Sequence, residues 1–172
     1  GSTIFNYENA SNLKRIPSSG SNRKTFTISA WVKRGNIGAS RCMFNAYDGS
    51  SSRRFQLSFN SDDKINYNQG GSGSSGLATS NQVFRDTNAW YHFVFVADYS
   101  NGTAADRFKV YVNGSQISLN ISDDIENASG QWNGAWANEI GVIDGSGNPF
   151  DGQMKEIYMV DGQALDSSYF GY

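Results

Sequence analysis

The chain has 172 residues, of which 38% are apolar, and its 14 Lys and Arg nearly balance 16 Asp and Glu. That balance excludes a basic block for binding nucleic acid, and no apolar run approaches the about 20 residues of a membrane helix. We expect one domain over residues 3–172, after a cloning remnant Gly1-Ser2, with no nucleic-acid partner, no membrane insertion and a lone Cys42 buried as a small apolar residue.

The first long predicted strand covers Thr25–Val32. Apolar residues occupy every second position from Phe26 to Val32, which is the period of a β-strand and not of a helix. The same alternation returns in Phe55, Leu57 and Phe59. Both segments are also rich in aromatic or β-branched residues, which favour strands.

A glycine- and serine-rich segment follows at Gln69–Gly76. Its composition is that of a flexible linker, but it lies between strands that need each other to close a sheet. We therefore predict a mobile loop within one domain.

The most apolar part of the chain contains two further predicted strands. In Ala89–Asp98, apolar residues occupy both alternating positions, which predicts a strand that is covered on both faces. The next strand starts at Arg107 and ends in Asn113-Gly114, a pair that tolerates the positive φ angles of a two-residue hairpin turn. Strands covered on both faces indicate two packed sheets.

The last predicted strand is Met154–Val160, where Ile157 and Met159 alternate with polar or aromatic neighbours. Asp166–Phe170 is expected to form a short 3₁₀ turn capped by the Asp166 carboxylate. The chain has 19 glycines, only two prolines and no longer amphipathic helix, so the predicted class is all-β.

Several of these segments together are similar to one known family, the concanavalin A-like lectin/glucanase superfamily. The order and spacing match best the laminin-G and pentraxin-like jelly rolls that occur as modules of tailed-phage structural proteins, especially of marine phages. The resemblance implies a jelly-roll β-sandwich of two antiparallel sheets, with binding at the concave face or the rim loops. The segments that carry it are Lys24–Arg34, Phe84–Asp86, Ala89–His92, Val110–Gly114, Phe150–Gly152 and Glu156–Leu165.

The sequence gives little support to a catalytic role. Glycoside hydrolysis requires two carboxylates about 5 to 9.5 Å apart, and the Glu-x-Asp-x-x-Glu pattern of glucanases does not occur. Glu156 and Asp161 would point to opposite faces of a regular strand, and Glu139 is isolated. The only histidine, His92, lies inside an apolar strand, and the resemblance implies that it packs there. We therefore expect a protein that is not an enzyme.

Two tryptophans outside the strand pattern suggest carbohydrate binding. Trp132 and Trp136 lie among amides and glycine, in a predicted loop before a strand at Glu139–Ile143. Flat aromatic rings suit the C–H face of a sugar. The alternative for Trp136 is that it covers the sheet edge as a core residue. For Trp132 the sugar-binding and core interpretations have equal weight.

Polar residues near these tryptophans would orient the sugar. We assign this role to Asn133, Asn138 and Asp144, because amides and carboxylates both bond hydroxyl groups. Three tyrosines are secondary aromatic candidates, namely Tyr47, Tyr67 and Tyr99.

A calcium site is a further hypothesis, although no cofactor is required. Asp144–Asn148 supplies the oxygen ligands and turn residues that calcium prefers. The pentraxin-like resemblance implies that this loop works with Asp48, so the tentative ligands are Asp48, Asp144 and Asn148. The fuller run of acidic and amide ligands in that pattern is absent, and simple Asp-Gly turns are the alternative.

These expectations combine into a lectin-like module of a phage virion. It would adhere weakly to a host-surface or extracellular polysaccharide, and its repetition on a tail fibre or capsid would supply avidity. The alternative is a structural or decoration module that contacts other virion proteins without binding sugar. In that case exposed strand edges and Phe170–Tyr172 would form the contacts.

Overall fold

The computed structural model describes residues 1–50, 54–71 and 74–171. Strands dominate, and the longest helical element spans four residues. The strands are β1 Thr3–Phe5, β2 Leu13–Arg15, β3 Thr25–Arg34, β4 Arg41–Tyr47, β5 Arg54–Phe59, β6 Lys64–Gly71, β7 Ser74–Val83, β8 Tyr91–Asp98, β9 Phe108–Val112, β10 Ser115–Gln116, β11 Leu119–Asp123, β12 Ala137–Ile140 and β13 Gly152–Asp161. The helical turns are η1 Tyr7–Asn9, α1 Ala104–Arg107 and η2 Ser167–Phe170.

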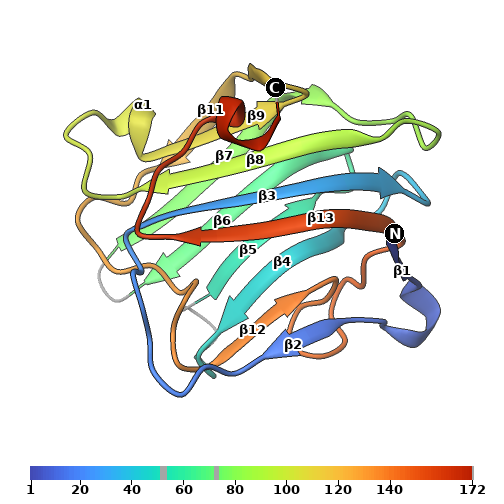
Figure 1. Ribbon diagram of the computed structural model, residues 1–172, viewed down its shortest axis with the longest axis horizontal. Helices are drawn as coiled ribbons and strands as arrows, with labels where there is room; N and C mark the ends of the chain where they lie inside the picture. Colours follow the sequence, from blue (N-terminus) through green and yellow to red (C-terminus); the bar gives the residue numbers. More distant parts are fainter. Residues whose placement is uncertain (51–53, 72–73, 172) are drawn as a thin grey trace.

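The strands form two antiparallel sheets that face each other (Figure 1). One sheet has six strands in the order β1-β13-β3-β8-β9-β10, and the other has seven in the order β11-β7-β6-β5-β4-β12-β2. Sequential neighbours such as β4, β5 and β6 pair directly, whereas β13 returns to pair with β3. The predicted all-β jelly-roll sandwich is confirmed.

An aromatic core fills the space between the sheets. Phe44 and Phe95 meet edge to face at 6.3 Å between ring centroids, and Phe59 meets Phe93 in the same way at 5.9 Å. Each pair joins a residue of the seven-stranded sheet to one of β8 in the six-stranded sheet. Edge-to-face packing of this kind adds to the free energy of burying the rings.

The predicted hairpin between β9 and β10 is confirmed. Asn113 and Gly114 have φ angles of 49° and 86°, the positive values of a two-residue turn. The Asn113 side chain also accepts a hydrogen bond from the His92 backbone N–H, at 2.8 Å, and so ties the turn to β8.

The prediction of a loop at Gln69–Gly76 is wrong for the residues of this segment that the structure describes. Gln69, Gly70 and Gly71 end β6 and pair with residues 74–76 at the start of β7, while residues 72 and 73 lie outside the described chain. A Cβ on Gly76 would lie 3.1 Å from the Tyr67 ring, so glycine here permits close packing. Fully buried Gln69 accepts a hydrogen bond from the Gln131 backbone N–H, at 3.0 Å, which fixes its side chain.

Two predicted strands differ at their ends or in their regularity. The segment expected at Glu139–Ile143 forms β12 but stops at Ile140, because Gly141 turns the chain with a φ of 91°. In β13 the register shifts around Glu156, which has a φ of 50°, so that Met154 and Met159 both lie opposite inward-facing residues of β3. Met159 is nevertheless 43% exposed, because it lines an open flank of the sandwich. Beyond β13, the Asp166 carboxylate caps η2 as predicted, accepting from the Ser168 N–H at 2.9 Å.

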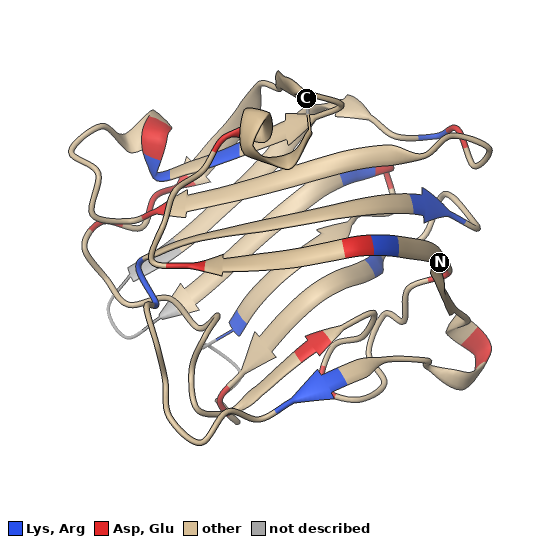
Figure 2. Ribbon diagram, in the orientation of Figure 1, with Lys and Arg blue, Asp and Glu red and all other residues tan. Residues whose placement is uncertain are grey.

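Positive and negative residues are scattered over both sheets and the loops of the described chain, and residues of opposite sign are adjacent in α1 and in β13 (Figure 2). None of the described helical segments is long and apolar enough to cross a membrane. Cys42 is fully buried in β4, as expected of a small apolar residue. Burial, with the nearby negative charge of Glu139, raises the pKa of its thiol well above the ordinary value.

Candidate functional site

Trp132 is a core residue. Its side chain is 6% exposed, and its ring packs against Phe55 at 5.1 Å and against Phe44 at 6.1 Å between centroids. Both partners belong to the inner face of the seven-stranded sheet. The structure therefore does not offer Trp132 as an open surface for a sugar ring, contrary to the sequence-based expectation, because the core already covers the indole.

Trp136 is partly buried and is held in place from several sides. Its Nε1 donates to the Gln131 carbonyl at 2.8 Å, and the Arg23 guanidinium lies over the ring at 4.6 Å. A Cβ on Gly134 would overlap the indole, so the loop can pass only because this residue is glycine. Trp136 matches the alternative interpretation, in which it covers the sheet edge.

The two predicted amides are used within the protein. Asn138 donates to the carbonyls of Gly134 and Trp136 at 3.1 and 2.9 Å, and its Oδ1 accepts from the Asn133 N–H at 3.0 Å. The Asn133 amide donates to the Asn22 carbonyl at 2.9 Å and to Asp161 at 3.2 Å. These bonds build the loop and leave the two amide groups little capacity for a ligand.

A different group of residues surrounds a polar pocket of about 180 Å³, which we call the outer-face pocket. It lies on the solvent side of the seven-stranded sheet, where β4 and β5 meet the loop that follows β12. Its residues are Asn45, Tyr47, Arg54, Ile143 and Asp144. Asp144 was predicted to orient a sugar, and Tyr47 was a secondary aromatic candidate.

The strand register explains why these side chains converge. Tyr47 pairs with Arg54, and Asn45 lies two residues before Tyr47, so all three project from the same face of the sheet. Their neighbours Phe44 and Phe55 point the other way, into the core. The pocket therefore follows directly from the alternation of β4 and β5.

A row of polar side chains extends from Asn45 across the same face. Lys14 pairs with Glu139, Glu139 with Asn45, Asn45 with Gln56, and Gln56 with Asn68. Directly opposed residues on neighbouring strands have side chains about 5 Å apart. The outer face thus carries a continuous line of hydrogen-bonding groups over five strands.

Asn45 is the chemically unusual member of the row. It is fully buried, and its Nδ2 donates to Glu139 Oε2 at 3.2 Å. Because a carboxylate can only accept, the amide must present its nitrogen to Glu139 and turn its oxygen away. That oxygen has no hydrogen-bond partner among the described residues, and a buried acceptor left unpaired costs free energy.

Glu139 carries a buried negative charge beside this amide. Its side chain is fully buried, and its other oxygen lies 3.4 Å from the half-exposed Lys14 ammonium. The Lys14 charge and the Asn45 amide together hold the carboxylate in place. Removing Lys14 would leave the buried charge without a counter-charge, and removing Asn45 would take away its hydrogen bond.

The tentative calcium ligands are exposed or partly exposed turn residues. Asp144 and Asn148 have φ angles of 48° and 43°, and the Asp48 carboxylate accepts from the Ser50 N–H at 2.9 Å. Tyr47 and Asp144 line one pocket, so the two loops do come close together. In the described part of the chain, no three His, Cys, Asp or Glu side chains gather into a metal-binding group.

His92 packs against its neighbours, as the family resemblance implied. Its Nε2 is 2.9 Å from the Ser29 hydroxyl, and its ring lies 5.0 Å from that of Trp31. Burial lowers the pKa of the imidazole, and the negative charge of Glu156 only partly opposes this effect. Asp161, the other carboxylate considered for catalysis, is bonded to the Asn22 N–H and the Asn133 amide.

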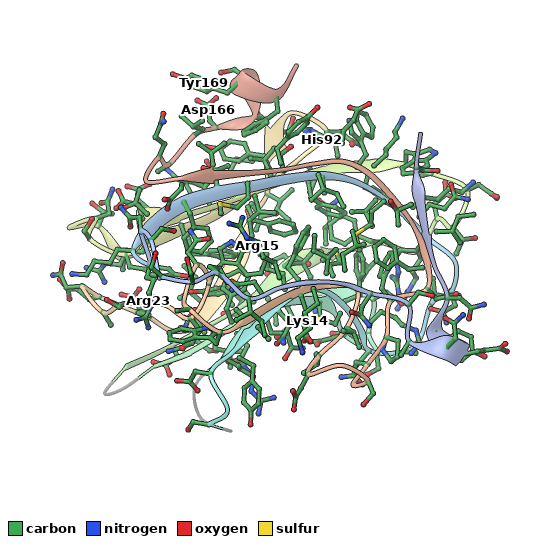
Figure 3. The ribbon with its side chains drawn as sticks, turned by 60° about the horizontal axis from the view of Figure 1, so that its bottom comes forward. Lys14, Arg15, Arg23, His92, Asp166 and Tyr169 are labelled. Atoms are coloured by element: carbon green, nitrogen blue, oxygen red, sulfur yellow. The ribbon has the colours of Figure 1, made fainter. Side chains whose placement is uncertain are left out.

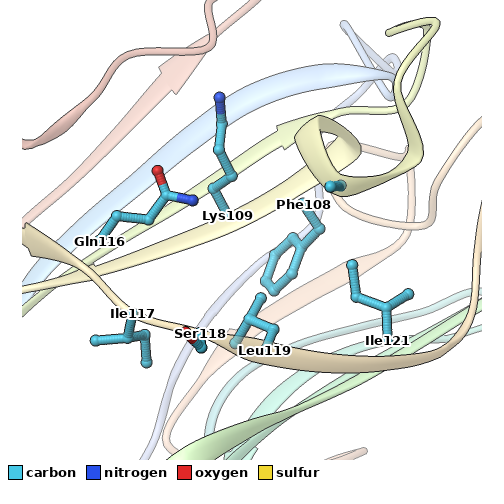
Figure 4. Close-up of a pocket in the computed structure, with 8 residues that line it drawn as sticks. Phe108, Lys109, Gln116, Ile117, Ser118, Leu119 and Ile121 are labelled. Carbon is cyan, nitrogen blue, oxygen red and sulfur yellow. The ribbon is translucent and has the colours of Figure 1, made fainter.

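Two other hollows occur at opposite flanks of the sandwich. One, of about 310 Å³, lies beside β10 and β11 and has mixed walls, in which Lys109, Gln116 and Ser118 join apolar residues around Phe108 (Figure 4). The other, of about 240 Å³, is called the flank cleft and includes three of the predicted sugar-binding residues. Its residues are Leu13, Lys14, Arg15, Pro17, Trp132, Asn133, Asn138, Ile140 and Met159.

Sequence reasoning missed Asn45 and Arg54. A signal was present for Asn45, because a single amide interrupts the apolar run from Cys42 to Ala46, and a buried strand accommodates such a group only with a bonding partner. For Arg54, the signal was its alternation with the apolar residues of β5. Neither pattern could show that the loop after β12 closes over this face.

Comparisons with known proteins agree on the fold. The family model described as the concanavalin A-like lectin/glucanases superfamily matches residues 8–167. Among solved structures, the Ruminococcus gnavus IT-sialidase CBM40 has a TM-score of 0.63 at 13% identity, covering 93% of this chain and 96% of that one. Domains LG4-5 of the mouse laminin alpha1 chain have a TM-score of 0.65 at 11% identity, covering 96% and 44%.

A third solved structure is the heptameric SAP-like pentraxin from Limulus polyphemus. Its TM-score is 0.58 at 19% identity, and the alignment covers 92% of this chain and 72% of that one. No curated protein sequence matches this chain. Identities this low establish a shared architecture and leave the ligand to be argued from the site itself.

Proposed function

Because the chain belongs to the concanavalin A-like lectin/glucanases superfamily, we propose that it is a non-catalytic carbohydrate-binding module whose sugar site is the outer-face pocket. The observation that carries the proposal is Asn45, a fully buried amide with an unpaired oxygen among the pocket residues. A sugar hydroxyl is a donor of suitable size to bond this oxygen and relieve its desolvation.

The remaining residues suit the other surfaces of a sugar ring. Tyr47 supplies an aromatic face for the apolar C–H side of the ring, and Asp144 supplies acceptors at the exposed rim. Gln56 and Asn68 continue the polar row beyond the pocket. A chain of several sugars could therefore lie across the strands of the outer face.

The structural comparisons support a sugar ligand in general terms. The Ruminococcus gnavus module has also been solved bound to alpha2,3 and alpha2,6 sialyllactose. Sialyllactose binding is a property of that protein. For this chain it supports only the class of ligand, a carbohydrate.

Calcium is proposed as an optional addition to the site. An ion held by Asp48, Asp144 and Asn148 would draw on carboxylate and amide oxygens, the ligands that calcium prefers. It would sit at the rim, where it could bind sugar hydroxyls directly. Sugar binding would then weaken when a chelator is added.

The biological setting is also a proposal. We suggest a module on the surface of a phage virion that adheres to host-surface or extracellular polysaccharide. A shallow polar pocket of about 180 Å³ gives weak binding at one site, and repeated copies would raise the avidity through effective concentration.

The experiment is a polysaccharide array probed with the purified protein, once with calcium and once with a chelator. The expected result is saturable binding to a defined glycan that falls at least tenfold in Tyr47→Ala and in Asp144→Ala. The matched control is Tyr158→Ala, which removes a 55% exposed tyrosine from β13 in the other sheet. Equal losses in the control and in Tyr47→Ala, or no glycan bound in either condition, would overturn the proposal.

A further inference from the structure

The flank cleft differs in chemistry from the outer-face pocket. It opens on the side of the sandwich where β2 and β12 of one sheet approach β13 of the other, with Leu13, Ile140 and Met159 among its walls. In Figure 3 this flank faces the viewer, with Arg15 on the side of β2 toward β13 and Lys14 on the opposite side.

Two of the three strands that border the cleft, β2 and β13, have open edges. β2 is the last strand of the seven-stranded sheet. β1 pairs with β13 only from Gly152 to Met154, so no described strand covers that edge of β13 from Lys155 to Asp161. An unpaired strand edge presents backbone N–H and C=O groups that can bond a further strand.

Apolar side chains are exposed around the same opening. Leu13 is 47% exposed and Met159 is 43% exposed, and both line the cleft. Single exposed apolar residues are ordinary, but two of them on the wall of one cleft, beside two open strand edges, form a patch. Patches of this kind are typical of surfaces that bind another protein.

The polar groups of the cleft favour an anion over a sugar hydroxyl. The amides of Asn133 and Asn138 bond within the protein, and Lys14 is paired with Glu139. Arg15 is exposed and forms no hydrogen bond or ion pair with the described residues. The available polar group at the rim is therefore a guanidinium, which prefers a carboxylate.

We propose that the flank cleft docks an extended peptide segment of a partner protein, which adds a strand to the open edge of β2. An apolar side chain of the peptide would enter the cleft, and an acidic residue beside it would pair with Arg15. Strand addition draws its affinity from main-chain hydrogen bonds and its specificity from such pockets. This interaction is independent of sugar binding at the outer-face pocket.

The charges on β2 argue against a second copy of this chain as the occupant. Pairing β2 with β2 of another copy would bring the two Lys14-Arg15 segments close together, and opposed like charges destabilise a strand pair. An acidic partner has the opposite effect. The basic edge of β2 therefore favours an acidic strand, and β2 of another copy is not acidic.

The probe is a labelled, capped heptapeptide of alternating Glu and Val, compared with its Lys–Val counterpart by fluorescence anisotropy and by amide chemical shifts. The expected result is saturable binding of the Glu–Val peptide, with shifts at Leu13–Arg15 and Met159, and binding of the Lys–Val peptide at least tenfold weaker. In the variant Arg15→Glu, which keeps the Lys14–Glu139 ion pair, this preference should be lost. The charge-matched control, Lys33→Glu on β3, should keep the original preference.

Three results would overturn the proposal. The first is equal binding of both peptides or none, and the second is a set of shifts outside the flank cleft. The third is self-association in light scattering that Arg15→Glu abolishes, which would assign the edge to a second copy.

Discussion

At the scale of single residues, a buried ion-pair cluster joins the two sheets beyond their aromatic contacts. Arg34 of β3 is 1% exposed and donates to Asp63 Oδ1 at 3.0 Å, and Arg85 donates to Asp63 Oδ2 at 2.9 Å. The Gly38 N–H donates to the same carboxylate at 2.7 Å. Asp63 follows β5 of the seven-stranded sheet, so one carboxylate bridges segments that the sequence keeps far apart.

Asp63→Asn should lower the free energy of unfolding by about 3 kcal/mol, because it leaves Arg34 buried without a counter-charge. Denaturant unfolding measures the change. Asp62→Asn is the matched control, since Asp62 pairs with Lys64 at the surface and its side chain is 55% exposed. Similar stability losses in both variants would contradict the importance assigned to the buried pair.

The same carboxylate predicts a dependence of stability on pH. Burial alone would raise the pKa of Asp63, but hydrogen bonds from Gly38, Arg85 and Arg34 outweigh it and lower the pKa from its ordinary 3.8. The resulting stabilisation is complete above the unfolded-state value and is lost as the pH falls through the lower folded-state value. Between pH 5 and 2, the unfolding free energy should therefore fall more steeply in the wild type than in Asp63→Asn, and parallel curves would contradict this assignment.

Trp132→Ala should act mainly on stability, because the indole fills the core against Phe44 and Phe55. We expect a loss of about 3 to 5 kcal/mol in unfolding free energy, and a smaller loss for Trp132→Phe, measured by denaturant unfolding. A Trp132→Ala protein that keeps its stability but loses sugar binding would restore the stacking role that the sequence suggested.

At the scale of elements, the start of β13 depends on one glycine. Gly152 has a φ of 140°, and a Cβ there would lie 2.1 Å from the Lys33 carbonyl oxygen. Gly152→Ala should therefore separate β13 from β3 and lower the unfolding free energy by about 2 to 3 kcal/mol. Gly102→Ala is the control in the same denaturation experiment, because no atom lies within 4 Å of its added Cβ. A tolerated Gly152→Ala would mean that the strand end can shift without loss.

The regular elements were predictable from the sequence because their patterns are local. Alternation identified β3 and β5, a continuous apolar run identified β8, and Asn113-Gly114 identified the turn after β9. The prediction of a loop at Gln69–Gly76 was wrong because composition suggested flexibility, whereas Gly76 permits close packing against Tyr67 and the described residues on either side pair as strands. The bulge at Glu156 carried no local signal, since it depends on how β13 pairs with β3.

At the scale of the whole molecule, the sequence indicated the family and the sandwich but suggested a surface role for Trp132, which is buried. Trp132 looked like a loop residue, and only the facing sheets show that its ring lies in the core. Asn45 and Asp144 are almost 100 residues apart in the chain, so their meeting in one pocket could not be read from spacing. Long-range pairing decides such a site, and a single sequence does not reveal it.

The central claim is that sugar binds the outer face of the seven-stranded sheet around Asn45. The most direct test is a titration of isotope-labelled protein with the best glycan from the array, followed by amide chemical shifts. We predict saturable shifts at Asn45, Tyr47, Arg54 and Asp144, extending along the polar row to Gln56. Shifts confined to the flank cleft or to the six-stranded sheet would contradict the account.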